Sequence, residues 1–74
     1  QIFQRYAPMV NGLAFRLLGR DDEIDDLVQE SFAQVLSSLH KLEHGAALRG
    51  WIATITVRTA HKMIRTRRLL RRFG

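Results

Sequence analysis

Hydrophobic residues recur at helical spacing in three stretches of the chain. In the first stretch they repeat every three or four residues, which places them on one side of a helix: Ile2, Phe3, Tyr6, Met9, Val10, Leu13, Leu17 and Leu18. Gly19 follows at a position where helices commonly end in a left-handed residue. Pro8 lacks a backbone N–H, so it should either kink this helix or mark a start nearer Ala7.

The second stretch carries an apolar stripe and a polar stripe on opposite sides. The apolar stripe comprises Ile24, Leu27, Val28, Ser31, Phe32, Val35, Leu36 and Leu39. The polar side comprises Asp22, Asp26, Gln29, Glu30, Ala33 and Ser37. Asp21 or Asp22 can cap this helix at its N-terminus, where the helix dipole also favours negative charge. The pattern predicts an amphipathic helix with one side facing solvent.

From His40 to Ala47 no helical period is sustained, and Gly45 favours a loop. A long third helix is expected from about Leu48 to Arg72. Its apolar side carries Ile52, Ile55, Thr56, Thr59, Ala60, Met63 and Leu70. Its other side carries Trp51, Thr54, Arg58, His61, Lys62, Arg65, Arg68 and Arg72. The chain is therefore predicted to form one all-α, compact three-helix domain over residues 1–74, with a long basic C-terminal helix.

Charge is distributed unequally along the chain. The net charge is +5, yet residues 1–40 hold six acidic and three basic residues, while residues 41–74 hold nine basic residues and one acidic residue. The two parts thus carry net charges of −3 and +8, which favours a polyanion as partner of the second part. Capping accounts for the acids at 21–23, whereas Asp26, Gln29 and Glu30 lie deeper and favour a partner contact. The alternative is that both are merely solvated faces.

The sequence lacks catalytic equipment. It has no cysteine, no nucleophile paired with a base, no phosphate loop and no histidine–carboxylate cluster for a metal. We therefore expect a binding domain rather than an enzyme, with no cofactor and no metal. No apolar run is long enough for a membrane span and no signal peptide is recognisable, which predicts a cytoplasmic protein. The start without methionine and the basic end indicate a piece of a longer chain.

The third helix combines a cationic stripe with an aromatic side chain at its start. Stacking of bases on an aromatic ring beside a positive groove is typical of single-stranded nucleic acid binding. Trp51 has a second interpretation, because a lone tryptophan at a helix start is more often part of the core. His61 is interpreted as a surface neighbour of the stripe.

Two strings of residues resemble region 2 of the extracytoplasmic-function (ECF) sigma factors of bacterial RNA polymerase. They are the string from Asp26 to Phe32, Asp-Leu-Val-Gln-Glu-Ser-Phe, and the string from Trp51 to Ile55, Trp-Ile-Ala-Thr-Ile, followed by a basic run. The first helix is similar to that family's opening helix and glycine turn at Tyr6, Val10, Arg16, Leu17, Leu18 and Gly19. The resemblance covers nearly the whole chain.

The resemblance implies a transcription initiation domain with two partners. Asp26, Gln29, Glu30 and Ala33 would dock on the arginine-rich clamp helices of the β′ subunit of core RNA polymerase. The loop from Leu42 to Arg49 would capture a base flipped out of the promoter minus-ten element, and the third helix would line the non-template single strand. The implied DNA contacts are His44, Arg49, Trp51, Thr54, Arg58, His61, Lys62, Arg65 and Arg68. Melting would then be capture of an opened strand.

The same resemblance implies an anti-sigma factor as a further partner, and a C-terminal helix-turn-helix domain (region 4) that is absent from these residues. Two positions depart from the family pattern: Arg58 stands where many relatives carry asparagine, and Lys62 where many carry aspartate. Both changes add cations, which predicts firmer backbone binding and an unusual or relaxed minus-ten preference.

Two alternatives from other classes remain. One is a protein-interaction or regulatory helical module, which leaves the stripe from Arg58 to Arg72 unexplained. The other is a basic amphipathic membrane-surface or calmodulin-target helix, because Leu69, Leu70 and Phe73 lie among arginines. That reading leaves the acidic face around Asp26 unexplained.

Overall fold

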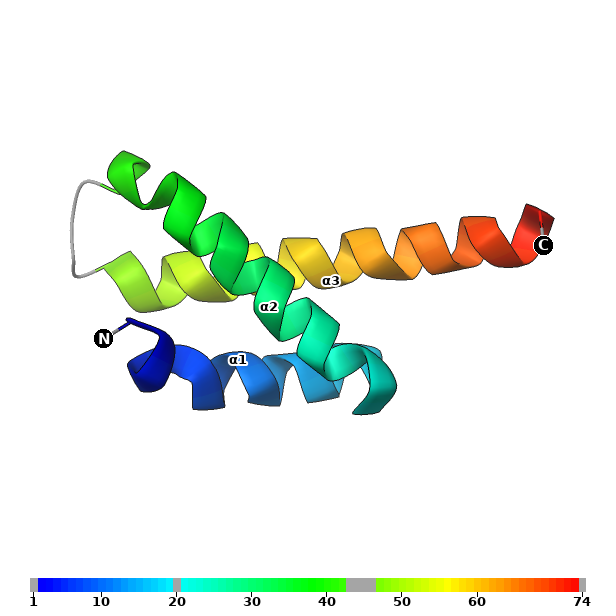
Figure 1. Ribbon diagram of the computed structural model, residues 1–74, viewed down its shortest axis with the longest axis horizontal. Coiled ribbons are helices and arrows are strands. Elements are labelled where there is room, and N and C mark those ends of the chain that lie inside the picture. Colours follow the sequence, from blue (N-terminus) through cyan, green and yellow to red (C-terminus); the bar gives the residue numbers. More distant parts are fainter. Residues whose placement is uncertain (1, 20, 43–46, 74) are drawn as a thin grey trace.

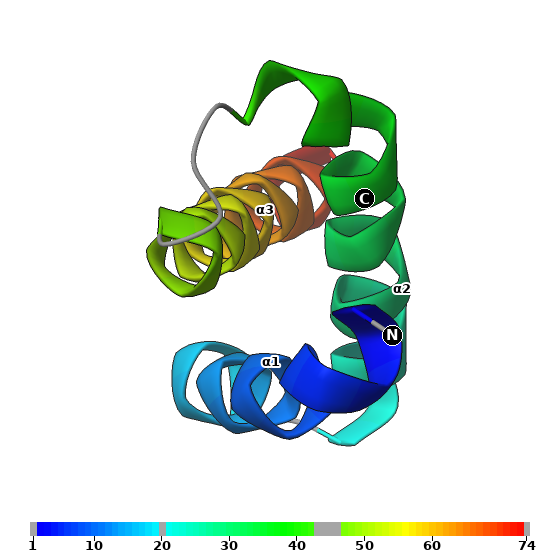
Figure 2. The same cartoon turned by 90° about the vertical axis from the view of Figure 1, so that its left-hand side faces the viewer.

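Three α-helices make up most of the chain. The computed structural model describes residues 2–19, 21–42 and 47–73. Its elements are α1 (Ile2–Leu18), α2 (Asp21–Ser38), a short 3-10 helix η1 (Leu39–Lys41) and α3 (Leu48–Phe73). Helices α1 and α3 lie side by side and α2 crosses both, as the two views in Figure 1 and Figure 2 agree. The predicted all-α, three-helix architecture is confirmed within these residues.

Helix α1 ends where the sequence predicts. Gly19 has a φ of +67°, and its N–H donates to the carbonyl oxygen of Phe15 at 2.9 Å, closing the helix. Pro8 lies inside α1, because six helical residues precede it. A start nearer Ala7 is therefore wrong. Pro8 has no N–H to offer the carbonyl of Gln4, and its ring is exposed to solvent.

Helix α2 begins at Asp21, so Asp21 and Asp22 lie within its first turn rather than ahead of it. The prediction that one of them caps the helix stays a prediction, because the residue before the helix is outside the described part of the chain. Acidic residues in this first turn still interact favourably with the helix dipole. The predicted loop from His40 to Ala47 is also shorter than expected, because η1 includes His40 and Lys41.

The core is formed by side chains from all three helices. It comprises Val10, Ala14, Leu18, Leu27, Val28, Phe32, Val35, Ile52, Ile55 and Ala60. The Phe3 ring is half exposed and packs on Phe32 with ring centroids 4.9 Å apart. Three hydroxyl residues are buried among these apolar groups: Ser31, Thr56 and Thr59.

Besides the half-exposed Phe3, two residues of the predicted apolar stripes are exposed. Leu36 on α2 is 65% exposed and Leu70 on α3 is 67% exposed. The C-terminal part of α3, which carries Leu70, projects beyond α1 and α2 (Figure 1). Leu36 follows the fully buried Val35 and lies at the border with the exposed face of α2 that carries Ala33. With 26 residues, α3 is about 39 Å long at 1.5 Å per residue, close to the longest dimension of 43 Å. The fold thus holds a basic helix that is packed in its first half and free on all sides near its end.

Candidate functional site

One exposed face of α2 carries the residues that the sequence assigned to a partner contact. Asp26, Gln29, Glu30 and Ala33 are all exposed and together line one shallow depression. Their spacing of three, one and three residues places them on one side of the helix, while Leu27, Val28 and Ser31 on the other side are buried. The packing of that buried side against α1 and α3 fixes the direction in which the acidic face points.

The exposed side of α3 carries a stripe of polar and cationic residues, which we call the cationic stripe: Thr54, Arg58, His61, Arg65 and Arg68. All five are exposed and lie on the side of α3 away from the core residues Ile52, Ile55 and Thr59. Thr54 donates its hydroxyl to the carbonyl oxygen of Gly50 at 2.9 Å. The structure therefore brings these predicted residues together along one helix.

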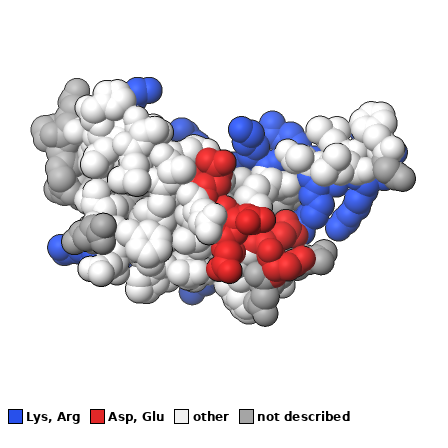
Figure 3. Space-filling model, viewed as in Figure 1, with Lys and Arg blue, Asp and Glu red and all other residues white. Residues whose placement is uncertain are grey.

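Acidic and basic side chains occupy different helices. Every acidic residue among the described ones belongs to α2, and the largest group of cations belongs to α3. Figure 3 shows the acidic residues gathered in the middle of one face, with basic residues along the projecting end of α3 beside them. The domain thus presents a negative and a positive surface next to each other.

Three further residues that were predicted to bind DNA lie elsewhere: Lys62, Arg49 and Trp51. Lys62 is exposed but turns toward α2, where it lines a groove with Glu30. Arg49 belongs to the first turn of α3 rather than to a loop, and it lines a groove against α1 together with Arg16. Trp51 is half-buried and packs against the core, so its ring is neither a fully buried core residue nor a fully exposed platform. The prediction for His44 lies outside the described residues.

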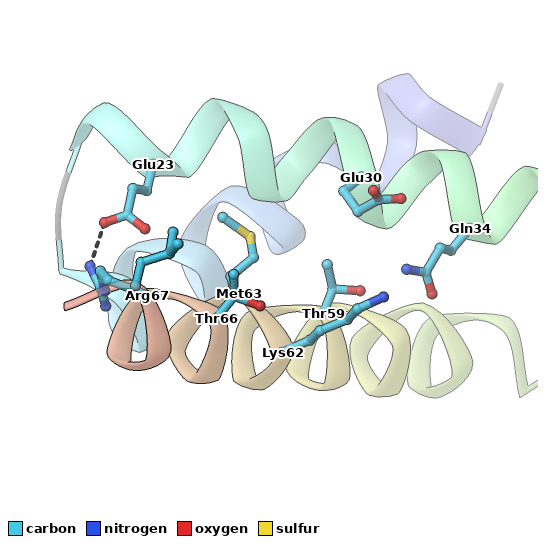
Figure 4. A pocket seen from close by; sticks show the side chains of 9 residues that line it. Glu23, Glu30, Gln34, Thr59, Lys62, Met63, Thr66 and Arg67 are labelled. Carbon is cyan, nitrogen blue, oxygen red and sulfur yellow. Dashed lines mark hydrogen bonds and ion pairs between the residues drawn. The ribbon is translucent and has the colours of Figure 1, made fainter. Parts of the chain in front are cut away.

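The groove between α2 and α3 has a volume of about 400 Å³. Figure 4 shows Met63 and Thr66 between the two helices, and Glu30, Gln34 and Lys62 toward one end. At the other end Arg67 donates to Glu23 in an ion pair. The side chains of this pair are only 26% and 21% exposed. Such a partly buried pair is screened less by salt than a pair on the open surface.

Sequence reasoning missed two features of these grooves. It gave Arg67 no partner, although the structure pairs this side chain with Glu23, which lies 44 residues earlier. It also did not group Arg16 with Arg49, although the two line the same groove. Both features depend on how the helices are rotated against each other, and neither leaves a periodic signal in the sequence.

Within the described residues, no three histidine, aspartate or glutamate side chains lie close enough to hold a metal ion. In the same part of the chain, no helix is both long and apolar enough to span a membrane.

Comparison with known proteins gives a consistent result. The family model described as Sigma-70 region 2 matches residues 2–70. The ECF RNA polymerase sigma factor SigE of Mycolicibacterium smegmatis is 32% identical over 71 residues, which cover 96% of this chain and 27% of that protein. The RNA polymerase sigma factor CarQ of Myxococcus xanthus is 31% identical over 67 residues, which cover 90% of this chain and 38% of CarQ.

A third relative, the RNA polymerase sigma factor SigV of Bacillus subtilis, is 34% identical over 59 residues, which cover 80% of this chain and 36% of SigV. The chain therefore spans roughly a third of the length of these relatives. No solved structure matches it significantly.

Proposed function

Because the chain belongs to the Sigma-70 region 2 family, whose members are non-enzymatic transcription initiation factors, we propose that it docks on core RNA polymerase and holds the opened minus-ten element of a promoter. The acidic face of α2 (Asp26, Gln29, Glu30 and Ala33) binds the clamp helices of the β′ subunit. The cationic stripe of α3 follows the backbone of the non-template strand. The observation that carries this proposal is the separation of the two charges onto exposed faces of two different helices.

The acidic face suits a basic helical partner. Its two carboxylates and one amide lie around the small side chain of Ala33, which leaves room for a partner to approach closely. Arginine forms strong, often bidentate hydrogen bonds with carboxylates, and clamp helices are rich in arginine. This face therefore gives the orientation of the domain on the polymerase.

The cationic stripe suits an unpaired strand better than a duplex. It is one helix wide, and the half-buried Trp51 near its start leaves part of a ring accessible for stacking. Flipping a base costs a few kcal/mol of unstacking, and least where the duplex is already opening. Phosphate contacts along α3 then stabilise the melted state, and no chemical step is required.

Two positions bear on the base preference. Arg58 is exposed within the stripe, and Lys62 is exposed at its edge, so both add positive charge close to the bound strand. We expect strong backbone binding and a relaxed preference for the minus-ten sequence. If the Arg58→Asn variant loses affinity equally on every sequence, Arg58 contacts only phosphate and reads no base.

Fluorescence anisotropy tests both contacts. Labelled single-stranded and duplex oligonucleotides with varied minus-ten-like sequences are titrated at two salt concentrations, with and without purified β′ clamp helices. We expect salt-sensitive preference for single strands, strengthened by the clamp fragment. Asp26→Asn should weaken clamp binding, whereas Asp25→Asn, an equal change at an exposed position outside the depression, should not. Loss of both DNA and clamp binding in the unaltered chain would refute the proposal.

Membership of the same family also implies a further DNA-binding domain and a further partner. A helix-turn-helix domain elsewhere in the whole protein would bind the upstream promoter element, so residues 1–74 alone should not select promoters. An anti-sigma factor would compete for these surfaces. The membrane-surface alternative draws on exposed Leu69, Leu70 and Phe73, and strong binding to anionic vesicles without binding to oligonucleotides would favour it.

A further inference from the structure

Arg49 points away from the cationic stripe. Arg58 follows Arg49 by nine positions in α3. At 3.6 residues per turn this is about two and a half turns, so the two side chains lie on opposite sides of the helix. Arg49 is exposed on the side of α3 that faces α1. A strand that followed the stripe alone would not reach it.

Arg49 meets a second arginine across a groove. The groove between α1 and α3 has a volume of about 380 Å³, and Arg16 of α1 lines it together with Arg49. Its remaining lining is apolar or small: Pro8, Met9, Gly12, Leu13 and Ala53.

Among the described residues, no carboxylate lies in this groove to neutralise the two guanidinium groups. All acidic residues in the described part of the chain lie on α2, and none of them lines the groove. Two cations held beside each other without an acidic partner repel, and an anion between them removes that repulsion. Guanidinium groups bind phosphate in a bidentate manner, which favours phosphate as that anion.

The groove adjoins the cationic stripe at one residue. Ala53 lines it, and Ala53 also lines a second depression together with Thr54, Val57 and Arg58. The small side chain at position 53 therefore lies at the junction between the stripe and the groove that the two arginines line.

We propose that the groove between α1 and α3 binds one nucleotide of the single strand that α3 holds, with Arg16 and Arg49 on its phosphate. Its unstacked base lies on the apolar floor formed by Met9 and Leu13, which replaces part of the stacking that the base has lost. This inference rests on the proposed function, and it adds α1 to the DNA-binding surface. Arg16 is then a DNA contact.

The test compares two arginines of the same helix. The Arg16→Gln variant should bind a single-stranded oligonucleotide of on the order of 12 nucleotides about fivefold more weakly, the effect of one lost charged contact. The slope of log affinity against log salt should fall by about 0.7, the value for one phosphate contact on a single strand. The Arg5→Gln variant makes the same charge change beside Tyr6, away from the groove, and should bind like the unaltered chain.

A second variant tests the junction at position 53 without changing the charge of the domain. Ala53→Leu fills the junction between the groove and the stripe, and it should also weaken binding of the same single-stranded oligonucleotide. In NMR titrations the amide of Gly12, which lines the groove, should shift when the oligonucleotide binds to the unaltered chain but not to Ala53→Leu. Circular dichroism of each variant checks that the helices are retained.

The outcomes separate this inference from the proposed function. If Arg58→Gln weakens binding while Arg16→Gln behaves like Arg5→Gln, the stripe binds DNA and the groove does not. An unchanged Gly12 amide, or Ala53→Leu binding as tightly as the unaltered chain, overturns the inference in the same way. If deoxyadenosine monophosphate alone shifts the Gly12 amide signal, with the same affinity as the oligonucleotide, this is a site for free nucleotides instead. If the unaltered chain binds no oligonucleotide, the proposed function itself fails.

Discussion

Ser31 offers a direct test of the packing described here, because its buried hydroxyl lacks a hydrogen-bond partner among the described residues. A buried hydroxyl without a partner costs about 1–3 kcal/mol. Ser31→Ala removes that cost, and alanine is the better helix former by a few tenths of a kcal/mol. The void left by one oxygen atom subtracts only a small amount. We therefore expect the free energy of unfolding to rise by about 1–2 kcal/mol.

Thermal unfolding followed by circular dichroism measures this change. For a domain of this size about 1 kcal/mol corresponds to roughly 4–8 °C in Tm. The matched control is Thr56→Val, which deletes a hydroxyl that is equally buried but donates to the carbonyl oxygen of Ile52 at 2.9 Å. That variant should gain no stability, because a satisfied bond is lost with the hydroxyl. An unchanged or lower Tm for Ser31→Ala, or an equal gain in both variants, would refute the reasoning.

Three other predictions concern the same scaffold. Ile52→Ala, at a fully buried position, should lower the free energy of unfolding by about 2–5 kcal/mol in urea denaturation, a large part of the roughly 4–11 kcal/mol expected for a domain of this size. No described atom lies within 4 Å of a methyl group added at Gly19 or Gly12, so the backbone conformation decides the effect. Gly19→Ala should lower the free energy of unfolding by about 1 kcal/mol, because its φ is +67°. Gly12→Ala lies inside α1 and should raise it by about 0.5–1 kcal/mol, because alanine favours the helix. Glu23→Gln and Arg67→Gln should each cost less than about 1 kcal/mol, and a double-mutant cycle should show that the two losses are not additive.

The helices themselves could be predicted because their boundaries are marked locally. The third helix was expected from about Leu48 to Arg72 and runs to Phe73. Periodicity identifies the side of a helix that is apolar, but it does not reveal whether another helix covers that side. Leu36 and Leu70 continue the apolar stripes and are nevertheless exposed. Leu70 lies on the projecting end of α3, whereas Leu36 lies at the border between the buried and the exposed side of α2.

In the candidate site, too, groupings within one helix could be predicted and contacts between helices could not. Asp26, Gln29, Glu30 and Ala33 share one face because their spacing within α2 requires it, so the sequence was sufficient to group them. The ion pair of Arg67 with Glu23, and the groove that Arg16 and Arg49 line, each involve two helices. Their contacts depend on the angle and rotation at which those helices pack, and these are set by the whole core rather than by any one stretch of sequence.

The proximity of the two charged faces has a consequence for how the domain responds to a partner. Glu30 of the acidic face and Lys62 at the edge of the cationic stripe line the same groove, so the carboxylates lower the positive potential that a DNA phosphate meets on α3. A basic partner that neutralises the acidic face removes this effect within the Debye length of about 10 Å at 0.1 M salt. DNA affinity should therefore rise when the partner binds, without any movement of α2 against α3, and Glu30→Gln should reproduce part of that gain in the free chain. Measured by anisotropy, the gain should shrink as salt is raised, because screening weakens the field of the carboxylates. A gain that persists unchanged at high salt would instead require a conformational change.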